Sequence, residues 1–204
     1  PGGRPPLNWA VADSRLEFIK FLLEKGARIN DVDSFGDTAL ACAAKVGHVN
    51  VIEYLIDAGA EIDKCGIQGK SPLSYAALNG HLDVITLLYK KGATNAPDLN
   101  GHTPLANAAA AGRLEVIDFF IKRGADLELF GPNGKGALSH ASEHGHLDAV
   151  KLLLTSEGAN INATDSNGET PLTSAVIENQ MAIVEFLLSE DGDVCKVCKK
   201  GRTP

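Results

Sequence analysis

The residues best suited to chemistry in this chain lie in one short segment. His140, Glu143 and His144 match the pattern H-x-x-E-H, in which two histidines hold a zinc ion beside a catalytic carboxylate. A helix places residues four apart on one face, so both imidazoles could reach one ion. No third ligand is evident in the sequence, and a stack of repeats supplies no closed cleft. We therefore predict no catalytic, cofactor or metal site here.

A second candidate for chemistry is the pair Cys195 and Cys198, spaced as C-x-x-C. A structural zinc site would need two further ligands, and a redox pair usually follows a strand in a different fold. The other cysteines, Cys42 and Cys65, are scattered and do not resemble a disulfide framework. We expect a reducing, intracellular setting, cytoplasmic or nuclear.

The bulk composition excludes several classes of partner. The chain has 204 residues, a formal net charge of −7 and 44% hydrophobic residues, which is typical of a globular protein. Non-specific binding to nucleic acid or anionic membrane needs a dense basic field, which an acidic chain lacks. No apolar run reaches the ~18 residues needed to span a bilayer. We expect a monomer that neither binds nucleic acid nor inserts into a membrane.

Glycines recur at a regular interval along the chain, and this interval defines the repeated elements that carry the candidate residues. They step by 33, 33, 32, 33, 34 and 33 residues and are Gly3, Gly36, Gly69, Gly101, Gly134, Gly168 and Gly201. A fixed period of this length indicates a repeat architecture. We predict one domain, 1–204. Its six repeats have approximate bounds 3–35, 36–68, 69–100, 101–133, 134–167 and 168–200, and residues 201–204 begin a further repeat.

Each repeat predicts two short helices. A hydroxyl residue such as Ser71 caps the first helix, and Pro72 takes its first position, where no backbone N–H is needed. That helix is rich in alanine and ends at a Gly-His pair, whose histidines are His48, His81 and His146. We expect these histidines to make structural hydrogen bonds. The second helix has apolar residues three and four positions apart and ends at a glycine in the left-handed region.

The fourth repeat reads GHTPL at 101–105, AAAAG at 108–112, LEVI at 114–117 and GA at 124–125. These motifs resemble the ankyrin repeat, and the resemblance extends over essentially the whole chain. It implies an all-α repeat solenoid of stacked helix-loop-helix units with β-hairpin-type fingers. It also implies a non-catalytic protein-protein interaction module that binds a partner protein or peptide along a concave groove and the fingers. The motifs specify the fold and do not name the partner.

The ends of the chain indicate that it belongs to a longer protein. The first repeat carries Phe18, Ile19 and Phe21 where a terminal cap should be polar, and residues 201–204 open another repeat. The alternative is an imperfect natural cap. The fifth repeat departs from the pattern, because Gly136 and Ala137 stand where Thr-Pro is expected.

Comparison of the repeats separates scaffold from binding surface. Leu73, Ala76 and Ala77 recur in equivalent form, and their spacing predicts one face that stacks against neighbouring repeats. Three other first-helix positions vary, and at ~100° per residue they point away from that face. We expect bulky second helices to curve the stack so that these positions line the groove. The predicted partner-binding residues are Trp9, Asp13, Phe35, Lys45, Tyr75, Asn79, Asn107, His140 and His144.

Aromatic and charged residues suggest the chemistry of the partner. Aromatics are the usual anchors of interfaces, although Trp9 and Tyr75 could instead be packing residues. The residue after each turn glycine is mostly basic, as at Arg4, Lys70 and Lys135. We expect a partner with an acidic or polar segment and one apolar anchor. The alternative is ordinary solvated surface charge.

Two other functions remain open. One is an architectural spacer, and the other is a substrate-recruiting or regulatory arm of an enzyme whose catalytic domain lies outside this sequence. The variety of side chains at equivalent first-helix positions, such as Trp9, Tyr75 and His140, favours binding over a spacer.

Overall fold

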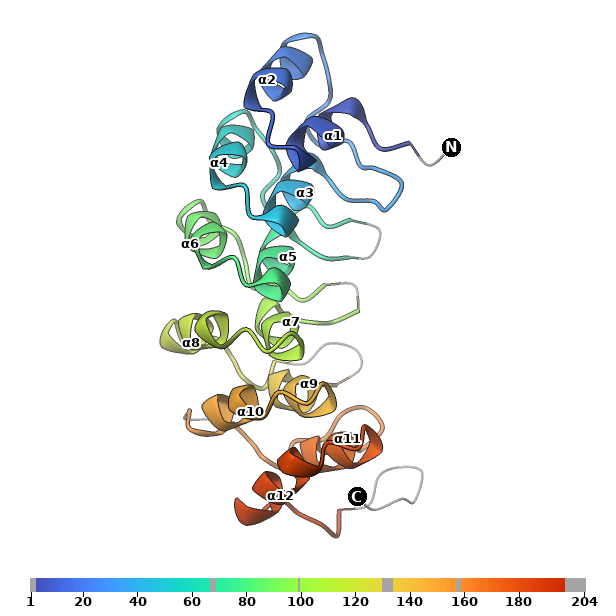
Figure 1. Ribbon diagram of the computed structural model, residues 1–204, viewed down its shortest axis with the longest axis vertical. Coiled ribbons are helices and arrows are strands. Elements are labelled where there is room, and N and C mark those ends of the chain that lie inside the picture. The colour runs from blue at the N-terminus through green and yellow to red at the C-terminus, as the bar shows by residue number, and fades with distance from the viewer. Residues whose placement is uncertain (1–2, 67–68, 99, 130–133, 157–158, 197–204) are drawn as a thin grey trace. The chain divides into compact units, whose positions relative to one another are not determined.

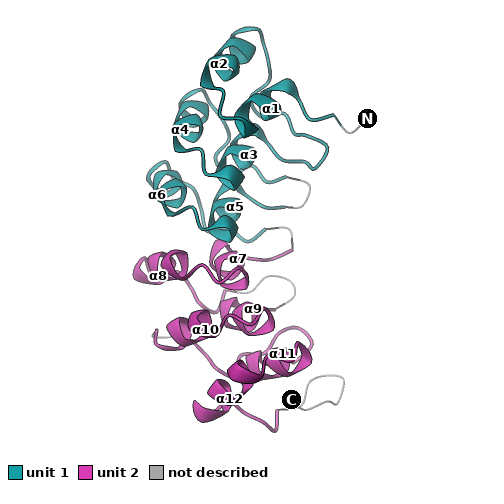
Figure 2. Ribbon diagram, in the orientation of Figure 1, with its two compact units in different colours: residues 1–99 teal, residues 100–204 magenta. Residues whose placement is uncertain are grey.

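The structure, a computed structural model, describes the chain apart from residues 1–2, 67–68, 99, 130–133, 157–158 and 197–204. Within the described residues the regular structure consists of twelve α-helices (Figure 1). The chain divides into two compact units, residues 1–99 and 100–204 (Figure 2). Each unit contains three of the helix pairs that the repeats predict.

Unit 1 pairs a first helix with a second helix three times. Its helices are α1 (Pro6–Ala12), α2 (Leu16–Glu24), α3 (Ala39–Val46), α4 (Val49–Asp57), α5 (Pro72–Asn79) and α6 (Leu82–Lys90). The first helices α1, α3 and α5 stack in order, and α4 packs against α6 on the side away from the finger loops (Figure 1).

Unit 2 repeats this arrangement. Its helices are α7 (Pro104–Ala110), α8 (Leu114–Lys122), α9 (Ala137–Glu143), α10 (Leu147–Leu154), α11 (Pro171–Ile177) and α12 (Met181–Ser189). Helix α9 packs between α7 and α11, and α10 packs between α8 and α12. The predicted class of all-α stacked helix-loop-helix repeats is confirmed.

Capping hydroxyls start the first helices, as the sequence predicts. Ser71 and Thr103 each accept a hydrogen bond from the backbone N–H three residues later, at 3.1 and 3.0 Å. Gly136 makes no side-chain cap at the start of α9. A serine or threonine cap stabilises a helix by a few tenths of a kcal/mol over glycine, so α9 begins with slightly less local support than its neighbours.

The Gly-His pairs fasten one repeat to the next. His48 and His81 place their Nε2 atoms 3.2 Å from the carbonyl oxygens of Ala12 and Lys45, each in the preceding repeat. His146 repeats this contact in unit 2, and there Gln180 takes the place of histidine one repeat later. The prediction of structural hydrogen bonding is confirmed for His48, His81 and His146.

The small first-helix residues form the stacking core. Leu73, Ala76 and Ala77 are fully buried, as predicted. The second helices add larger buried side chains, among them Leu88 and Phe120. Burial of each such side chain contributes about 1.5–3 kcal/mol, so the core holds the helices that carry the variable positions.

Two details differ from the sequence-based expectation. The described fingers contain a single β-bridge, between Val32 and Thr38, so their hairpins are mostly turns rather than paired strands. At the end of α12 the left-handed residue is Asp191 instead of Gly192. The predicted start of a further repeat at 201–204 lies outside the described residues.

Candidate functional site

Aspartates shape the finger loops that precede the first helices. Asp33 Oδ1 accepts hydrogen bonds from the backbone N–H groups of Phe35 and Asp37, at 2.9 and 3.0 Å. Asp165 Oδ1 accepts the equivalent pair from the residues two and four positions later, both at 2.8 Å. Such turns fix the finger tips and leave the second oxygen, Oδ2, for another partner.

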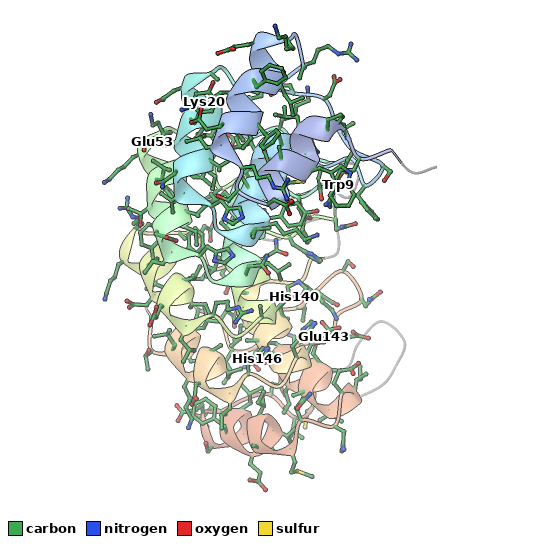
Figure 3. All side chains as sticks on the ribbon, turned by 45° about the horizontal axis from the view of Figure 1, so that its top comes forward. Trp9, Lys20, Glu53, His140, Glu143 and His146 are labelled. Carbon is green, nitrogen blue, oxygen red and sulfur yellow. The ribbon has the colours of Figure 1, made fainter. Side chains whose placement is uncertain are left out.

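Trp9 and Phe35 are exposed aromatic side chains, with 59% and 60% of their surfaces accessible. The Arg4 guanidinium lies 5.0 Å from the centre of the Trp9 ring, and its Nε lies 3.5 Å from Asp33 Oδ2. Asp33 also holds the turn that presents Phe35. We call Trp9, Arg4 and Phe35, which these contacts link through Asp33, the aromatic patch. Figure 3 shows Trp9 on the side of unit 1 opposite the labelled second-helix residues.

A hollow of about 380 Å³ lies beside the aromatic patch. Trp9, Pro6, Phe18 and Leu22 contribute apolar side chains to its walls. Asp13, a predicted contact residue, also lines it and is exposed. The hollow could accept an apolar side chain of a partner.

Three further predicted contact residues remain accessible to solvent. Lys45 is exposed and places its ammonium 5.3 Å from the centre of the Tyr75 ring. Asn79 is half-buried and donates its amide to the Tyr75 carbonyl at 2.9 Å. His144 is exposed, and its Nδ1 lies 3.0 Å from the carbonyl oxygen of His140.

The expectation of an exposed first-helix face is wrong for Tyr75, Asn107 and His140, which are only 4%, 3% and 6% exposed. For Tyr75 and His140 the reason is the finger of the preceding repeat, which packs against this position. The Tyr75 hydroxyl reaches Asp37 on one finger, and the His140 ring packs edge-on against His102 on another, with ring centres 4.6 Å apart. Helical periodicity predicts which residues share a face of one helix, but it does not predict whether a loop from another repeat covers that face.

The contact between Tyr75 and Asp37 closes a buried polar cluster in unit 1. The Tyr75 hydroxyl donates to Asp37 Oδ1 at 2.8 Å, and Asn8 donates its amide to the Asp37 carbonyl at 3.0 Å. Burial raises the pKa of Asp37, although the hydrogen bond from Tyr75 opposes this rise. Burial and the hydrogen bond to Asp37 raise the pKa of Tyr75. The cluster holds a finger against α5.

The basic finger residues are paired with carboxylates. Lys70 Nζ lies 3.1 Å from Asp98 Oδ2, which repeats the pairing of Arg4 with Asp33. Lys135 Nζ lies 3.1 Å from Glu143 Oε2. These neighbours partly neutralise the basic finger positions, so the finger edge is not the open basic stripe on which an acidic partner was predicted. Arg202 lies outside the described residues.

The segment from His140 to His144 forms a polar cluster in unit 2. His140 Nδ1 lies 3.9 Å from Glu143 Oε2, and Figure 3 shows these side chains close together. One ligand atom from each of His140, Glu143 and His144 lies within 4.8 Å of the other two. Two imidazoles and a carboxylate are donors that could hold a zinc-like ion.

The electrostatics of this cluster differ from residue to residue. Burial, with the neighbouring His102, lowers the pKa of His140 to about 4, so its imidazole is neutral at pH 7. Burial raises the pKa of Glu143, but the hydrogen bond and charge of Lys135 bring the pKa below its ordinary value. The cluster therefore combines a neutral imidazole with an ionised carboxylate.

Sequence reasoning missed the part of this site that comes from other elements. Lys135, His102 and Asp165 line the same hollow as the His140 cluster. Asp165 Oδ2 is buried and has no hydrogen-bond partner. The repeat register offers one signal, because Lys135 and Asp165 correspond to the paired Lys70 and Asp98.

The cysteine pair adds no described site. Cys195 is exposed with a free thiol, and Cys198 lies outside the described residues. Within the described part of the chain, no helix has both the length and the apolar character needed to cross a bilayer.

The family description "Ankyrin repeats (3 copies)" matches residues 1–66, 59–131, 91–165 and 128–200. The chain therefore belongs to the ankyrin repeat family, as its motifs predict. Ankyrin repeats are generally protein-interaction modules. The fold also resembles the crystal structure of the human ASB11 ankyrin repeat domain, with a TM-score of 0.83 and 24% identity. That match covers 98% of this chain and 90% of the ASB11 chain.

Curated relatives share parts of the chain. Palmitoyltransferase akr1 of Schizosaccharomyces pombe is 44% identical over 59 residues, which are 29% of this chain and 9% of that protein. The ankyrin repeat protein YahD of Escherichia coli is 38% identical over 84 residues, 39% of this chain and 42% of that protein. Ankyrin repeat domain-containing protein 63 of Mus musculus is 44% identical over 64 residues, 31% of this chain and 16% of that protein. The chain spans less than half the length of each of these relatives.

Proposed function

We propose that this chain binds a partner protein through the aromatic patch of unit 1 and performs no chemistry of its own. The observation that carries the proposal is that Trp9 and Phe35 are both exposed. Trp9 lies on α1 and Phe35 on a finger, and Arg4 and Asp33 link these two elements. Tryptophan and arginine are enriched among the residues that dominate interface affinity. A rigidly presented aromatic also loses little conformational freedom on binding.

The proposed partner presents an apolar side chain to the hollow beside Trp9. Asp13 lines that hollow, and Lys45 and Asn79 are further accessible polar residues on the first helices of the same unit. We do not extend the proposal to an acidic segment, because Arg4 and Lys70 already have carboxylate neighbours. Binding should accordingly depend weakly on salt, since apolar contacts are not screened.

The test compares proteins captured from a cell lysate by three forms of the chain. The double variant Trp9→Ala/Phe35→Ala removes the aromatic patch. Phe21→Ala is the matched control, because Phe21 is also an exposed aromatic but belongs to the second helix α2. We expect the parent and the control to recover the same proteins, and the double variant to recover them at least about tenfold less. Equal recovery by all three forms would contradict the proposal.

A second candidate function is that of a recruiting arm within an enzyme. The observation in its favour is the 59-residue match to a palmitoyltransferase. In that case the parent protein should modify the partners captured by the aromatic patch. Trp9→Ala/Phe35→Ala in the complete protein should then lower modification of those partners and leave activity on a small substrate intact. Equal modification of the captured partners would exclude this role.

We also propose a monomeric, intracellular module. The free thiols of Cys42, Cys65 and Cys195 support a reducing environment. Light scattering of the purified chain tests the monomer, and a mass of twice the chain would contradict it.

A further inference from the structure

We propose that His140, Glu143 and His144 bind a divalent transition-metal ion of the zinc class. The three side chains line a hollow of about 490 Å³ in unit 2, together with Lys135 and Asp165. The sequence-based expectation of no metal rested on the lack of a third ligand and of a cleft. Glu143 supplies the third ligand, with candidate atoms within 4.8 Å of one another, and the hollow supplies the space.

His140 is the strongest single indication of a ligand. Its side chain is 8% exposed, and both ring nitrogens are buried without a hydrogen-bond partner. A buried polar group left without a partner destabilises the folded state. A metal ion on one nitrogen would remove much of that destabilisation.

His144 makes a backbone contact that is common among metal-binding histidines. Its Nδ1 lies 3.0 Å from the carbonyl oxygen of His140. If that nitrogen donates its N–H to the carbonyl, Nε2 carries the free lone pair. Metal-binding histidines usually donate their second ring N–H to a carbonyl or carboxylate in this way. Zinc ligands lie about 2.0–2.2 Å from the ion, so small rotations of Glu143 and His144 must close the present spacing.

Lys135 occupies the place that the ion would take beside Glu143. Its ammonium lies 3.1 Å from Glu143 Oε2, and a divalent ion on this carboxylate would repel it. Asp165 Oδ2, buried and unpartnered in the same hollow, can accept the displaced ammonium. The resulting pair would match Lys70 with Asp98 in unit 1. Metal binding would thus restore an ion pair that the repeat register predicts.

A second group of possible ligands in unit 1 does not share these properties. Asp33, Asp37 and Cys42 also lie within reach of one another. However, Arg4 pairs with Asp33, and Tyr75 donates to Asp37. Burial, with the charges of the two aspartates, raises the pKa of Cys42 to about 11, which disfavours the thiolate that a metal needs.

The test is calorimetric titration of the full chain with Zn²⁺ after removal of metal by a chelator. All forms carry Cys195→Ser and Cys198→Ser, which eliminates the cysteine pair as a competing site. We expect saturable binding of one ion per chain. His144→Ala changes an exposed side chain and should fold normally. It should bind at least about 100-fold more weakly, because even loss of a group behind a ligand costs about 10–100-fold.

Two further variants separate this site from general effects of histidine or charge. His81→Gln is the matched control, because Gln180 fills the equivalent place in another repeat, and its zinc affinity should equal that of the parent. Lys135→Met removes the competing ammonium and should tighten binding several-fold. Absence of zinc binding in the cysteine-free parent, or undiminished binding by His144→Ala, would overturn the proposal. Unchanged affinity in Lys135→Met would overturn the displacement of Lys135.

Discussion

Tyr75 in unit 1 and His140 in unit 2 occupy the same place in their repeats, but they differ in whether their polar side-chain atoms have a hydrogen-bond partner. Each lies on a first helix against the finger residue 38 positions earlier, Asp37 or His102. The Tyr75 hydroxyl donates a hydrogen bond to Asp37 at 2.8 Å. Both ring nitrogens of His140 are buried without a hydrogen-bond partner.

The difference shows how one scaffold position can serve stability or ligand binding. Leu73 and Ala76 of α5 have identical counterparts in Leu138 and Ala141 of α9, so we attribute the difference to the paired side chains. The Tyr75 hydroxyl and the Asp37 carboxylate form a hydrogen bond with each other, so neither needs a ligand. The edge-to-face packing of His140 on His102 leaves the two buried nitrogens of His140 available to a ligand. Substitutions at the two positions should therefore have opposite effects on folding.

Tyr75→Phe should give the largest effect. It removes the donor to Asp37 and leaves a buried carboxylate oxygen without a partner, so we expect a loss of about 1–3 kcal/mol in the free energy of unfolding. Urea denaturation measures this loss. Tyr54→Phe on the second helix α4 is the control and should change stability by less than about 0.5 kcal/mol. Equal losses in both variants would remove the contrast between the units.

His140→Leu should have the opposite sign. It replaces two unpartnered nitrogens with an apolar group of similar size, so we expect a gain of about 1 kcal/mol without metal. The control is His146→Leu, which breaks the contact with the Ala110 carbonyl and should destabilise the chain. Denaturation in the presence of chelator measures both changes. A loss in His140→Leu as large as that in His146→Leu would mean that His140 is a satisfied packing residue.

A pH titration should give a smaller effect, because Tyr75, Lys45 and Arg4 offset part of the rise that burial causes in the pKa of Asp37. The folded chain binds this proton more tightly than the unfolded chain. Its contribution to stability is therefore greatest below the ordinary carboxyl pKa and is lost as the pH rises through the raised value. Asp37→Asn should remove this component. If the stability difference between parent and variant stayed constant with pH, Asp37 would titrate normally.

Gly136→Ser should give the smallest effect. Gly136 stands where Ser71 caps α5 in unit 1, and its extended backbone suits a serine. A capping hydroxyl should stabilise α9 by a few tenths of a kcal/mol over glycine. Ser71→Gly is the reciprocal change and should cost about the same. Thermal unfolding of both variants measures the pair, and a loss in Gly136→Ser would show that a side chain does not fit there.

Much of the fold follows from local sequence. The glycine interval predicts the helix pairs, and α5 begins at Pro72 after the capping Ser71 and ends before Gly80 as predicted. The buried alanines of α5, Ala76 and Ala77, were also identified from their spacing. These features depend on neighbours within about four residues, where sequence pattern is informative.

The candidate sites depended on contacts between repeats. Trp9 and Phe35 were correctly expected to be exposed, since both are in fact accessible aromatics. Tyr75 and His140 were wrongly expected to be exposed, because a finger residue 38 positions earlier in the chain packs against each of them. The sequence also does not show that Lys135 pairs with Glu143 and not with Asp165.

The sequence by itself therefore determined the repeat, the helices and the family, because periodic local interactions specify them. Only the tertiary structure decided which variable side chains face solvent, which are covered, and which buried polar atoms lack partners. Those outcomes depend on how the fingers pack against the first helices and on which of several carboxylates a lysine reaches. In this chain the H-x-x-E-H segment provides a candidate metal site only because such packing buries His140 and leaves Asp165 Oδ2 without a hydrogen-bond partner.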